Sequence, residues 1–189
     1  SGYEPKTREF QRSWYLQRYG WETLQNLADF LHTQQFILDA GTGLGRDIKF
    51  YAENTEAEIF GVDMSRGIDI AYQHTGHLPN VHLIQGDLRS LPFRRDFFDF
   101  ISSDFVLHHT PSNEESLRYL ASFLKEGGQI AIYVYKKKGP VREFCDDYMR
   151  SYTTKLSPEE CRKFSEAVTK FGKSLSDLNV EISVPEDIP

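Results

Sequence analysis

The sequence predicts an α/β protein built on a doubly wound, mostly parallel sheet with helices on both faces. Between about residues 35 and 135, short apolar runs alternate with stretches of helical character. The runs are continuously apolar, as in strands that are buried on both faces of a sheet. Strand–helix alternation implies right-handed crossovers, which build an open parallel sheet covered by helices. The length of 189 residues is enough for one domain with a sizeable core.

Five runs are predicted to form strands, and they span residues 36–38, 57–62, 81–85, 98–102 and 129–135. The clearest helix is predicted over residues 112–125, where leucines and an alanine recur at helical spacing. Ser112 and Glu115 form a capping-box pattern at its start, and Gly127 and Gly128 follow its predicted end. These elements make up a predicted core at residues 35–135.

The two ends of the chain differ from this core. Residues 1–34 form a predicted N-terminal segment, with one or two helices between about 7 and 31. Residues 136–189 form a predicted helical C-terminal segment that opens with a break at 136–140. Helices are expected at 141–152 and after Ser157, which forms a capping-box pattern with Glu160. We expect all three parts to belong to a single domain of residues 1–189.

Composition excludes several classes of protein. No apolar run approaches the roughly 18 residues of a membrane-spanning helix. Fourteen Phe and ten Tyr exclude wholesale disorder. The formal net charge of −6 is a poor match to a phosphate backbone, so a nucleic-acid partner is disfavoured. Cys145 and Cys161 form no C-x-x-C pair and are expected to be reduced thiols of a cytoplasmic protein with no membrane attachment.

The strongest local pattern is the stretch Phe-Ile-Leu-Asp-Ala-Gly-Thr-Gly-Leu-Gly-Arg-Asp at residues 36–47. A strand leads into a glycine-rich turn and then a helix, so a ligand can approach the backbone amides closely. A dinucleotide fingerprint needs glycine where Arg46 stands, which argues against nicotinamide binding. Asp39 would attract a cationic ligand, although a plain tight turn remains the alternative reading.

Polar side chains also follow the next three predicted strands. Asp63 ends the second strand, 24 residues after Asp39, where a carboxylate can accept both hydroxyls of a ribose or serve only as a helix cap. Asp87, after the third strand, could accept a hydrogen bond from an exocyclic amine. The end of the fourth strand carries Ser103, Asp104, His108 and His109.

These four segments, in this order, resemble the class I S-adenosylmethionine-dependent methyltransferases, in particular the small-molecule group with the motif D-x-G-x-G-x-G. The resemblance covers about residues 35–135. It implies a Rossmann-like sheet with S-adenosyl-L-methionine lying across the strand ends and S-adenosyl-L-homocysteine as product. The cofactor-binding residues that it implies are Asp39, Ala40, Gly41, Thr42, Gly43, Asp63, Met64, Asp87, Leu88, Ser103 and Asp104.

The resemblance also implies a role for each of these positions. The first strand end would hold the methionine portion, Asp63 the ribose, and Met64, Asp87 and Leu88 the adenine. Ser103 or Asp104 would reach the methionine portion through the backbone. Thr42 stands where family members often carry Ser or Cys, which is a mild departure.

The predicted function is methyl transfer to a small or medium-sized acceptor. His108 and His109 are the candidates for acceptor binding or proton abstraction, with packing against the sheet as the alternative. The motif N-P-P-Y is absent after the fourth strand, which argues against methylation of a nucleic-acid base. No metal site is predicted. The alternative functions are a non-catalytic binding or scaffold protein of the same fold and, less favoured, a nicotinamide-dependent oxidoreductase.

Two further expectations concern the ends. Trp14, Tyr15, Arg18, Tyr19 and Trp21 would form a lid over cofactor and acceptor, or pack as an ordinary helix on the sheet. Family members close the sheet with an antiparallel strand pair, whereas only one candidate strand, at 179–184, follows the last helix here. We therefore expect the closing strands to be missing, through truncation or disorder, and the C-terminal segment to exchange its amides quickly. The start at Ser1-Gly2 rather than at Met fits a piece of a longer chain.

Overall fold

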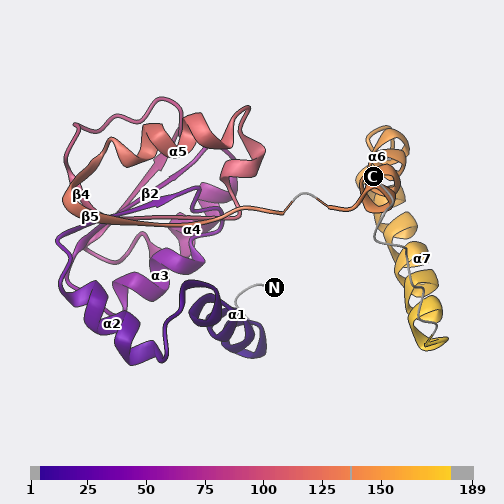
Figure 1. The fold of residues 1–189 in the computed structure, drawn as a ribbon, viewed down its shortest axis with the longest axis horizontal. Helices are drawn as coiled ribbons and strands as arrows, with labels where there is room; N and C mark the ends of the chain where they lie inside the picture. Colours follow the sequence, from indigo (N-terminus) through magenta and orange to yellow (C-terminus); the bar gives the residue numbers. More distant parts are fainter. Residues whose placement is uncertain (1–4, 137, 180–189) are drawn as a thin grey trace. The chain divides into compact units, whose positions relative to one another are not determined.

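A computed structural model describes residues 5–136 and 138–179 (Figure 1). Contacts between residues divide the chain into two compact units, Ser1–Tyr135 and Lys136–Pro189. This division falls at the end of the core expected from the sequence. Each unit is described by itself below, and the single domain expected from the sequence stays a prediction.

The first unit contains a five-stranded sheet in which every pair of neighbours is parallel. The order across the sheet is β3-β2-β1-β4-β5. The strands are β1 (Phe36–Ala40), β2 (Glu58–Asp63), β3 (Val81–Gln85), β4 (Phe98–Asp104) and β5 (Leu124–Tyr133). The α/β, doubly wound architecture expected from the sequence is therefore confirmed.

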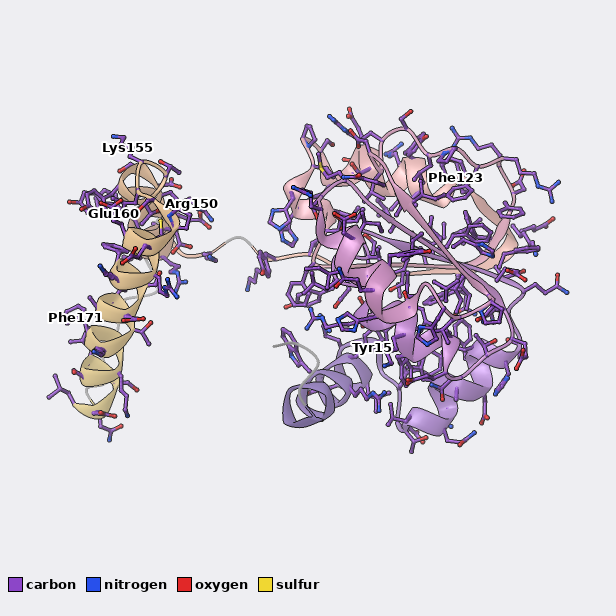
Figure 2. All side chains as sticks on the ribbon, turned by 180° about the vertical axis from the view of Figure 1, so that it is seen from behind. Tyr15, Phe123, Arg150, Lys155, Glu160 and Phe171 are labelled. Atoms are coloured by element: carbon purple, nitrogen blue, oxygen red, sulfur yellow. The ribbon has the colours of Figure 1, made fainter. Side chains whose placement is uncertain are left out.

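Helices cover both faces of this sheet (Figure 1). They are α1 (Pro5–Tyr19), α2 (Leu24–His32), α3 (Arg46–Ala52), α4 (Gly67–Thr75), the short 3-10 helix η1 (Leu107–His109) and α5 (Asn113–Ala121). Successive residues of β1 point to opposite faces. Ile37 packs in a cluster with Tyr15 of α1, whereas Leu38 packs in a second cluster that includes Phe123, and Figure 2 labels both aromatic side chains.

The direction of the crossovers reverses at β1, which lies between β2 and β4. In an open α/β sheet such a reversal leaves a crevice outside the carboxyl ends of the strands, and ligands bind there. The hydroxyl of Ser103 donates to the carbonyl oxygen of Ala40 (2.9 Å) and joins the ends of β4 and β1. This edge of the sheet positions the candidate site.

One predicted element was wrong in its extent. The helix expected to run to residue 125 ends at Ala121, and β5 begins at Leu124 and includes both glycines that were expected to follow the helix. Leu124 pairs with Phe98, and a register shift follows between Phe98 and Phe100. Pairing with β4 therefore overrides the local helical pattern at this point.

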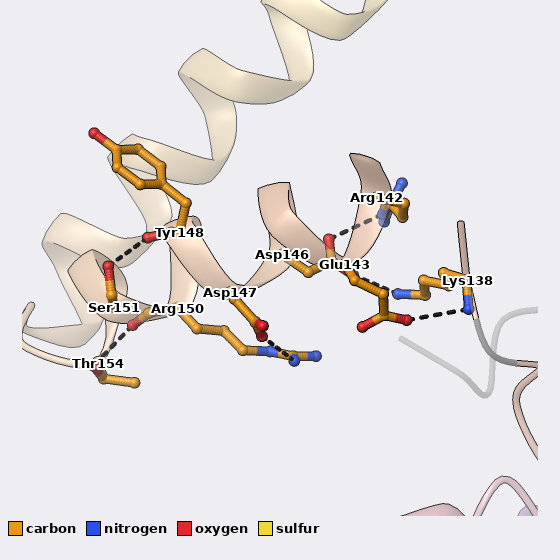
Figure 3. Close-up of polar contacts among 9 residues, drawn as sticks. All are labelled: Lys138, Arg142, Glu143, Asp146, Asp147, Tyr148, Arg150, Ser151 and Thr154. Carbon is orange, nitrogen blue, oxygen red and sulfur yellow. Dashed lines mark hydrogen bonds and ion pairs between the residues drawn. The ribbon is translucent and has the colours of Figure 1, made fainter. Parts of the chain in front are cut away.

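The second unit contains two helices, α6 (Pro140–Thr153) and α7 (Pro158–Asp177). The capping box of Ser157 and Glu160 is present at the start of α7, as predicted. Ion pairs and hydrogen bonds tie α6 and the residues beside it together, including the Arg142 contact with Asp146 at 2.9 Å (Figure 3). Neither helix contains a buried residue.

Large apolar side chains of the second unit stay exposed instead. They include Val141, Phe144, Tyr148, Phe171 and Leu178, and Figure 2 labels Phe171 on α7. The predicted strand at 179–184 lies outside the described residues, apart from Asn179. Across residues 5–136 and 138–179, no helix combines the length and the apolar character needed to cross a membrane.

Candidate functional site

The glycine turn after β1 takes backbone conformations that other residues rarely adopt. Gly41 has φ +91° and Gly43 has φ +53°. A Cβ at Gly41 would overlap the side chain of Val106, so the turn lies directly against the loop that follows β4. At Gly43, by contrast, nothing lies within 4 Å of where a Cβ would be. The backbone at Gly43 is therefore open to a ligand.

Asp63 connects the glycine turn to the end of β2. Its Oδ2 accepts a hydrogen bond from the N–H of Gly43 (2.8 Å). Its Oδ1 accepts from the N–H (2.8 Å) and the hydroxyl (2.6 Å) of Ser65. An ionised carboxylate has about four lone-pair sites, so Oδ1 is fully used by Ser65, whereas Oδ2 keeps one site for a further hydrogen bond. Met64, the next residue, is 72% exposed beside it.

Three buried or half-buried carboxyl groups lie near the same edge. Burial, followed by repulsion from Asp47, raises the pKa of Asp39 well above its usual range. Burial, followed by Asp104, raises the pKa of Asp47 to about 6. Burial also raises the pKa of Asp104, although Arg18 opposes this shift. A ligand that carries positive charge would relieve the repulsion among these groups.

Asp87, which follows β3, already accepts hydrogen bonds from a neighbouring side chain. The side chain of Arg89 donates to both of its carboxylate oxygens, with the shortest contact at 2.6 Å. These hydrogen bonds lower the pKa of Asp87 to about 2. Leu88 packs at the border of the second core cluster. Any amine that binds Asp87 would share it with Arg89.

Helix α1 is joined to the end of β4 through Asp104. Arg18 forms an ion pair with Asp104 (2.9 Å), and the hydroxyl of Tyr19 donates to the same oxygen (2.9 Å). Tyr15 is buried and its hydroxyl lies 3.0 Å from that of Tyr51 on α3. Helix α1 therefore contacts both the end of β4 and the helix that follows the glycine turn, and it packs on the sheet as well.

The two candidate histidines lie in η1, just after β4. The ring of His108 stacks on Tyr135 with centroids 4.0 Å apart and lies 4.1 Å from the ring of His109. Burial, followed by His109, lowers the pKa of His108, which favours the neutral imidazole. Both of its ring nitrogens are buried and have no hydrogen-bond partner among the described residues. His109 is exposed.

A cavity of about 150 Å³ opens beneath α1. Its lining includes Arg18, Arg46, Asp47, Asp104 and Phe105. Arg46 and Asp47 follow the glycine turn directly, and Asp104 and Phe105 follow Ser103, so the cavity adjoins the carboxyl ends of β1 and β4.

The structure brings together the candidate residues at the ends of β1, β2 and β4, since these three strands are neighbours. Asp87 and Leu88 follow the outer strand β3, and the side chain of Ala40 is fully buried. Sequence reasoning missed Asp47, Val106 and Tyr135. Asp47 stands beside the glycine turn and could have been noticed, whereas nothing local marks the other two.

These residues fit a cofactor that combines a nucleoside with a positively charged amino-acid portion. The open backbone at Gly43 gives room beside the turn. The carboxyl groups of Asp39 and Asp47 favour positive charge, and Asp63 keeps a free acceptor site on Oδ2 for a hydroxyl.

Comparisons with known proteins agree with this geometry. The family model described as a methyltransferase domain matches residues 38–132. A ubiquinone/menaquinone biosynthesis C-methyltransferase of Vibrio parahaemolyticus is 29% identical over 160 residues, which is 81% of this chain and 59% of that protein. A tRNA (carboxymethyluridine(34)-5-O)-methyltransferase of Saccharomyces cerevisiae is 34% identical over 101 residues, which is 52% of this chain and 34% of that protein.

Among solved structures, the YcgJ protein of Bacillus subtilis is similar with a TM-score of 0.55 and 28% sequence identity. That match covers 67% of this chain and 57% of the other. The matched regions thus span only 34% to 59% of the lengths of these three relatives.

Proposed function

Because this chain belongs to the methyltransferase domain family, we propose that it transfers the methyl group of S-adenosylmethionine to a small or medium-sized acceptor. The cofactor supplies a sulfonium that releases its methyl group readily. The task of the protein is then to align the acceptor with the methyl carbon and the sulfur and to exclude water. This accounts for a site rich in binding groups and poor in nucleophiles.

One observation supports this proposal most strongly. The hydrogen bond from the Gly43 N–H to Asp63 (2.8 Å) couples the glycine turn to the carboxylate that ends β2. This arrangement places an open backbone and an acceptor-rich carboxylate side by side at the reversal point of the sheet. If Asp63 binds the ribose of the cofactor, the parts of the cofactor that are attached to this ribose would lie over the glycine turn.

We assign the role of general base to His108 and keep His109 as the second candidate for it. A neutral imidazole can accept a proton from an acceptor hydroxyl or amine. Neither ring nitrogen of His108 has a hydrogen-bond partner among the described residues, which supports this role. A methyl acceptor that binds beside Tyr135 would supply such a partner. An acceptor that has no proton to lose would need no base.

Asp63→Ala tests the cofactor assignment. Loss of a charged acceptor for a ribose hydroxyl should weaken S-adenosylhomocysteine binding by at least about tenfold, since about 1.4 kcal/mol corresponds to one decade. Asp87→Ala should weaken it less, because Arg89 already competes for that carboxylate. Isothermal titration calorimetry of wild type and both variants measures this, with circular dichroism as the check of folding.

Three outcomes separate this proposal from the alternatives. Unchanged affinity in a folded Asp63→Ala variant would contradict the assignment. Binding of the cofactor without turnover on any acceptor would favour a non-catalytic protein of this fold. Tight binding of NADH to the wild type would favour an oxidoreductase.

His108→Asn tests the assigned base. Turnover on an identified acceptor should fall by roughly 10²–10⁴-fold, as is typical when a general base is removed. The affinity for S-adenosylhomocysteine should stay the same. Turnover that survives in both His108→Asn and His109→Asn would indicate that the two histidines have a structural role and not a catalytic one.

The similarity to a tRNA methyltransferase makes RNA a second acceptor class to test. The net charge of −6 disfavours it, because binding to a phosphate backbone depends on clustered positive charge. A gel-shift titration with total tRNA at low and moderate salt would decide between the two classes.

A further inference from the structure

A cluster of aromatic side chains lies at the carboxyl ends of β4 and β5, outside the motifs expected to bind the cofactor. Trp14 of α1 lies against Phe105 (ring centroids 5.3 Å) and Tyr133 (6.0 Å). Phe105 also contacts Tyr135 at 5.4 Å. We call Trp14, Phe105, Tyr133 and Tyr135 the aromatic cluster. It is next to Asp104, so it faces the part of the crevice farthest from β2 and β3.

The backbone at the centre of this cluster is strained. Phe105 has φ +62°, a left-handed conformation that is uncommon for a bulky residue. Its N–H is held by the carbonyl oxygen of Tyr133 (3.0 Å). Strain of this kind persists where the surrounding structure enforces it, and it gathers at ligand sites. Here it fixes the ring of Phe105 between Trp14 and Tyr135.

Arg18 brings a positive charge into the cluster. Its guanidinium lies 4.3 Å from the ring centroid of Trp14, 4.9 Å from Phe105 and 4.6 Å from Tyr133. The side chain is only 10% exposed, and its Nε has no hydrogen-bond partner among the described residues. Asp104 neutralises part of its charge at 2.9 Å. The guanidinium therefore has a donor left for an anionic oxygen.

The adjoining cavity has the size and lining of a site for one aromatic ring. Its volume of about 150 Å³ is close to that of an apolar cavity that accommodates benzene. Trp14, Tyr15, Phe50 and Phe105 provide aromatic walls. Arg12, Arg18, Arg46 and Lys49 provide four cationic groups, against the three acids Asp47, Glu53 and Asp104. The lining thus combines flat apolar surface with one more cationic group than acidic groups, and Arg18 is the cation that lies among the aromatic rings.

We propose that Arg18, Trp14 and Phe105 bind the methyl acceptor and that this acceptor is an aromatic ring that carries an anionic oxygen, such as a carboxylate or phenolate. The proposal rests on the proposed function, because it places the acceptor beside the site assigned to the cofactor. The ring stacks on the aromatic cluster and the oxygen accepts from the guanidinium of Arg18. A planar guanidinium between aromatic faces matches a planar anion in both shape and charge.

Three probes of similar size and different charge test this: benzoate, benzyl alcohol and benzylammonium. Saturation-transfer NMR on the full chain should show binding of benzoate, weaker binding of benzyl alcohol and none of benzylammonium. Arg18→Met keeps an unbranched apolar side chain and removes the guanidinium and its charge, and it should weaken benzoate binding at least about tenfold. Arg118→Met, an exposed arginine on α5 paired with Glu114, is the matched control and should not change benzoate binding.

A second variant covers the case in which Arg18→Met fails to fold. Trp14→Leu should lose benzoate binding, whereas Trp14→Phe should retain most of it, because the ring face is what the acceptor contacts. Preference of the wild type for benzylammonium would overturn the proposal, as would unchanged benzoate binding in Arg18→Met.

Calorimetry with S-adenosylhomocysteine on the same variants separates this proposal from the proposed function. Affinity within about twofold of wild type in Arg18→Met is expected. A tenfold loss with benzoate binding intact would assign Arg18 to the amino-acid end of the cofactor and overturn the acceptor assignment. Absence of S-adenosylhomocysteine binding in the wild type would instead contradict the proposed function, whatever the result with benzoate.

Discussion

The two units of the chain share the same local signals but differ in what they do with their apolar side chains. Both contain helices with N-caps and apolar residues at helical spacing, such as α5 and α7. In the first unit these side chains enter two core clusters around the sheet. In the second unit no residue of α6 or α7 is buried. Local patterning is therefore enough to specify a helix, whereas stability depends on what the helix packs against.

Amide exchange should show the largest difference between the units. The β1 and β4 amides, such as those of Leu38 and Ile101, lie in the inner strands of the sheet and should open only with the whole first unit, whereas α6 and α7 contain no buried residue. We expect protection at least about 10³-fold higher in these strands than in residues 141–177. Hydrogen-exchange mass spectrometry measures it. Equal protection in both units would show that α6 and α7 are covered in solution by a surface that the second unit does not itself supply.

Replacing one phenylalanine in each unit should show how differently the two units depend on their apolar side chains for stability. Phe100 is 4% exposed and contacts the rings of Phe30 and Tyr51, whereas Phe171 on α7 is 64% exposed. Phe100→Ala should lower the free energy of unfolding by about 3–5 kcal/mol, and Phe171→Ala should change it by less than about 0.5 kcal/mol.

Urea denaturation followed by both tryptophan fluorescence and far-ultraviolet circular dichroism checks this pair. Trp14 and Trp21 are the two tryptophans of the chain and both lie in the first unit, so fluorescence reports on that unit. A loss above about 1 kcal/mol for Phe171→Ala would mean that the exposed face of α7 is covered in solution.

A smaller difference between the two units should appear in how the free energy of unfolding depends on pH. Burial and Asp104 raise the pKa of Asp47 to about 6 in the folded state, against about 3.9 in an unfolded chain. The folded state therefore binds more protons between about pH 4 and 6, so Asp47 makes the protein less stable as pH rises through this range. Asp47→Asn should raise the free energy of unfolding by about 1–2 kcal/mol at pH 7.5 and have little effect below about pH 4.

Asp177→Asn is the matched control, because Asp177 lies exposed at the end of α7 and pairs with Lys173. It should leave the pH dependence unchanged. Thermal unfolding of wild type and both variants at pH 4, 6 and 7.5 provides the measurement. An Asp47→Asn variant that is no more stable at pH 7.5 than the wild type would show that the carboxyl group is solvated or paired.

Much of the first unit could be predicted from the sequence because its signals are local. The apolar runs predicted all five strands and hence the doubly wound class, which the order β3-β2-β1-β4-β5 confirms. The glycine turn was recognised from the residue types that positive φ angles require, and Gly41 and Gly43 have such angles. The extent of α5 could not be predicted, because pairing of Leu124 with Phe98 is a contact between distant residues.

The candidate site also has one part that the sequence predicts and another part that only the tertiary structure shows. The sequence by itself determined which carboxylates lie at which strand ends, since Asp39 and Asp63 are among the last two residues of β1 and β2 and Asp87 follows β3. Only the tertiary structure decided that Arg18 of α1 pairs with Asp104 across 86 positions of the chain and lies among rings from α1, from β5 and from the loop after β4. Such contacts depend on how helices and strands pack, and side-chain packing is set by shape and burial that no short stretch of sequence encodes.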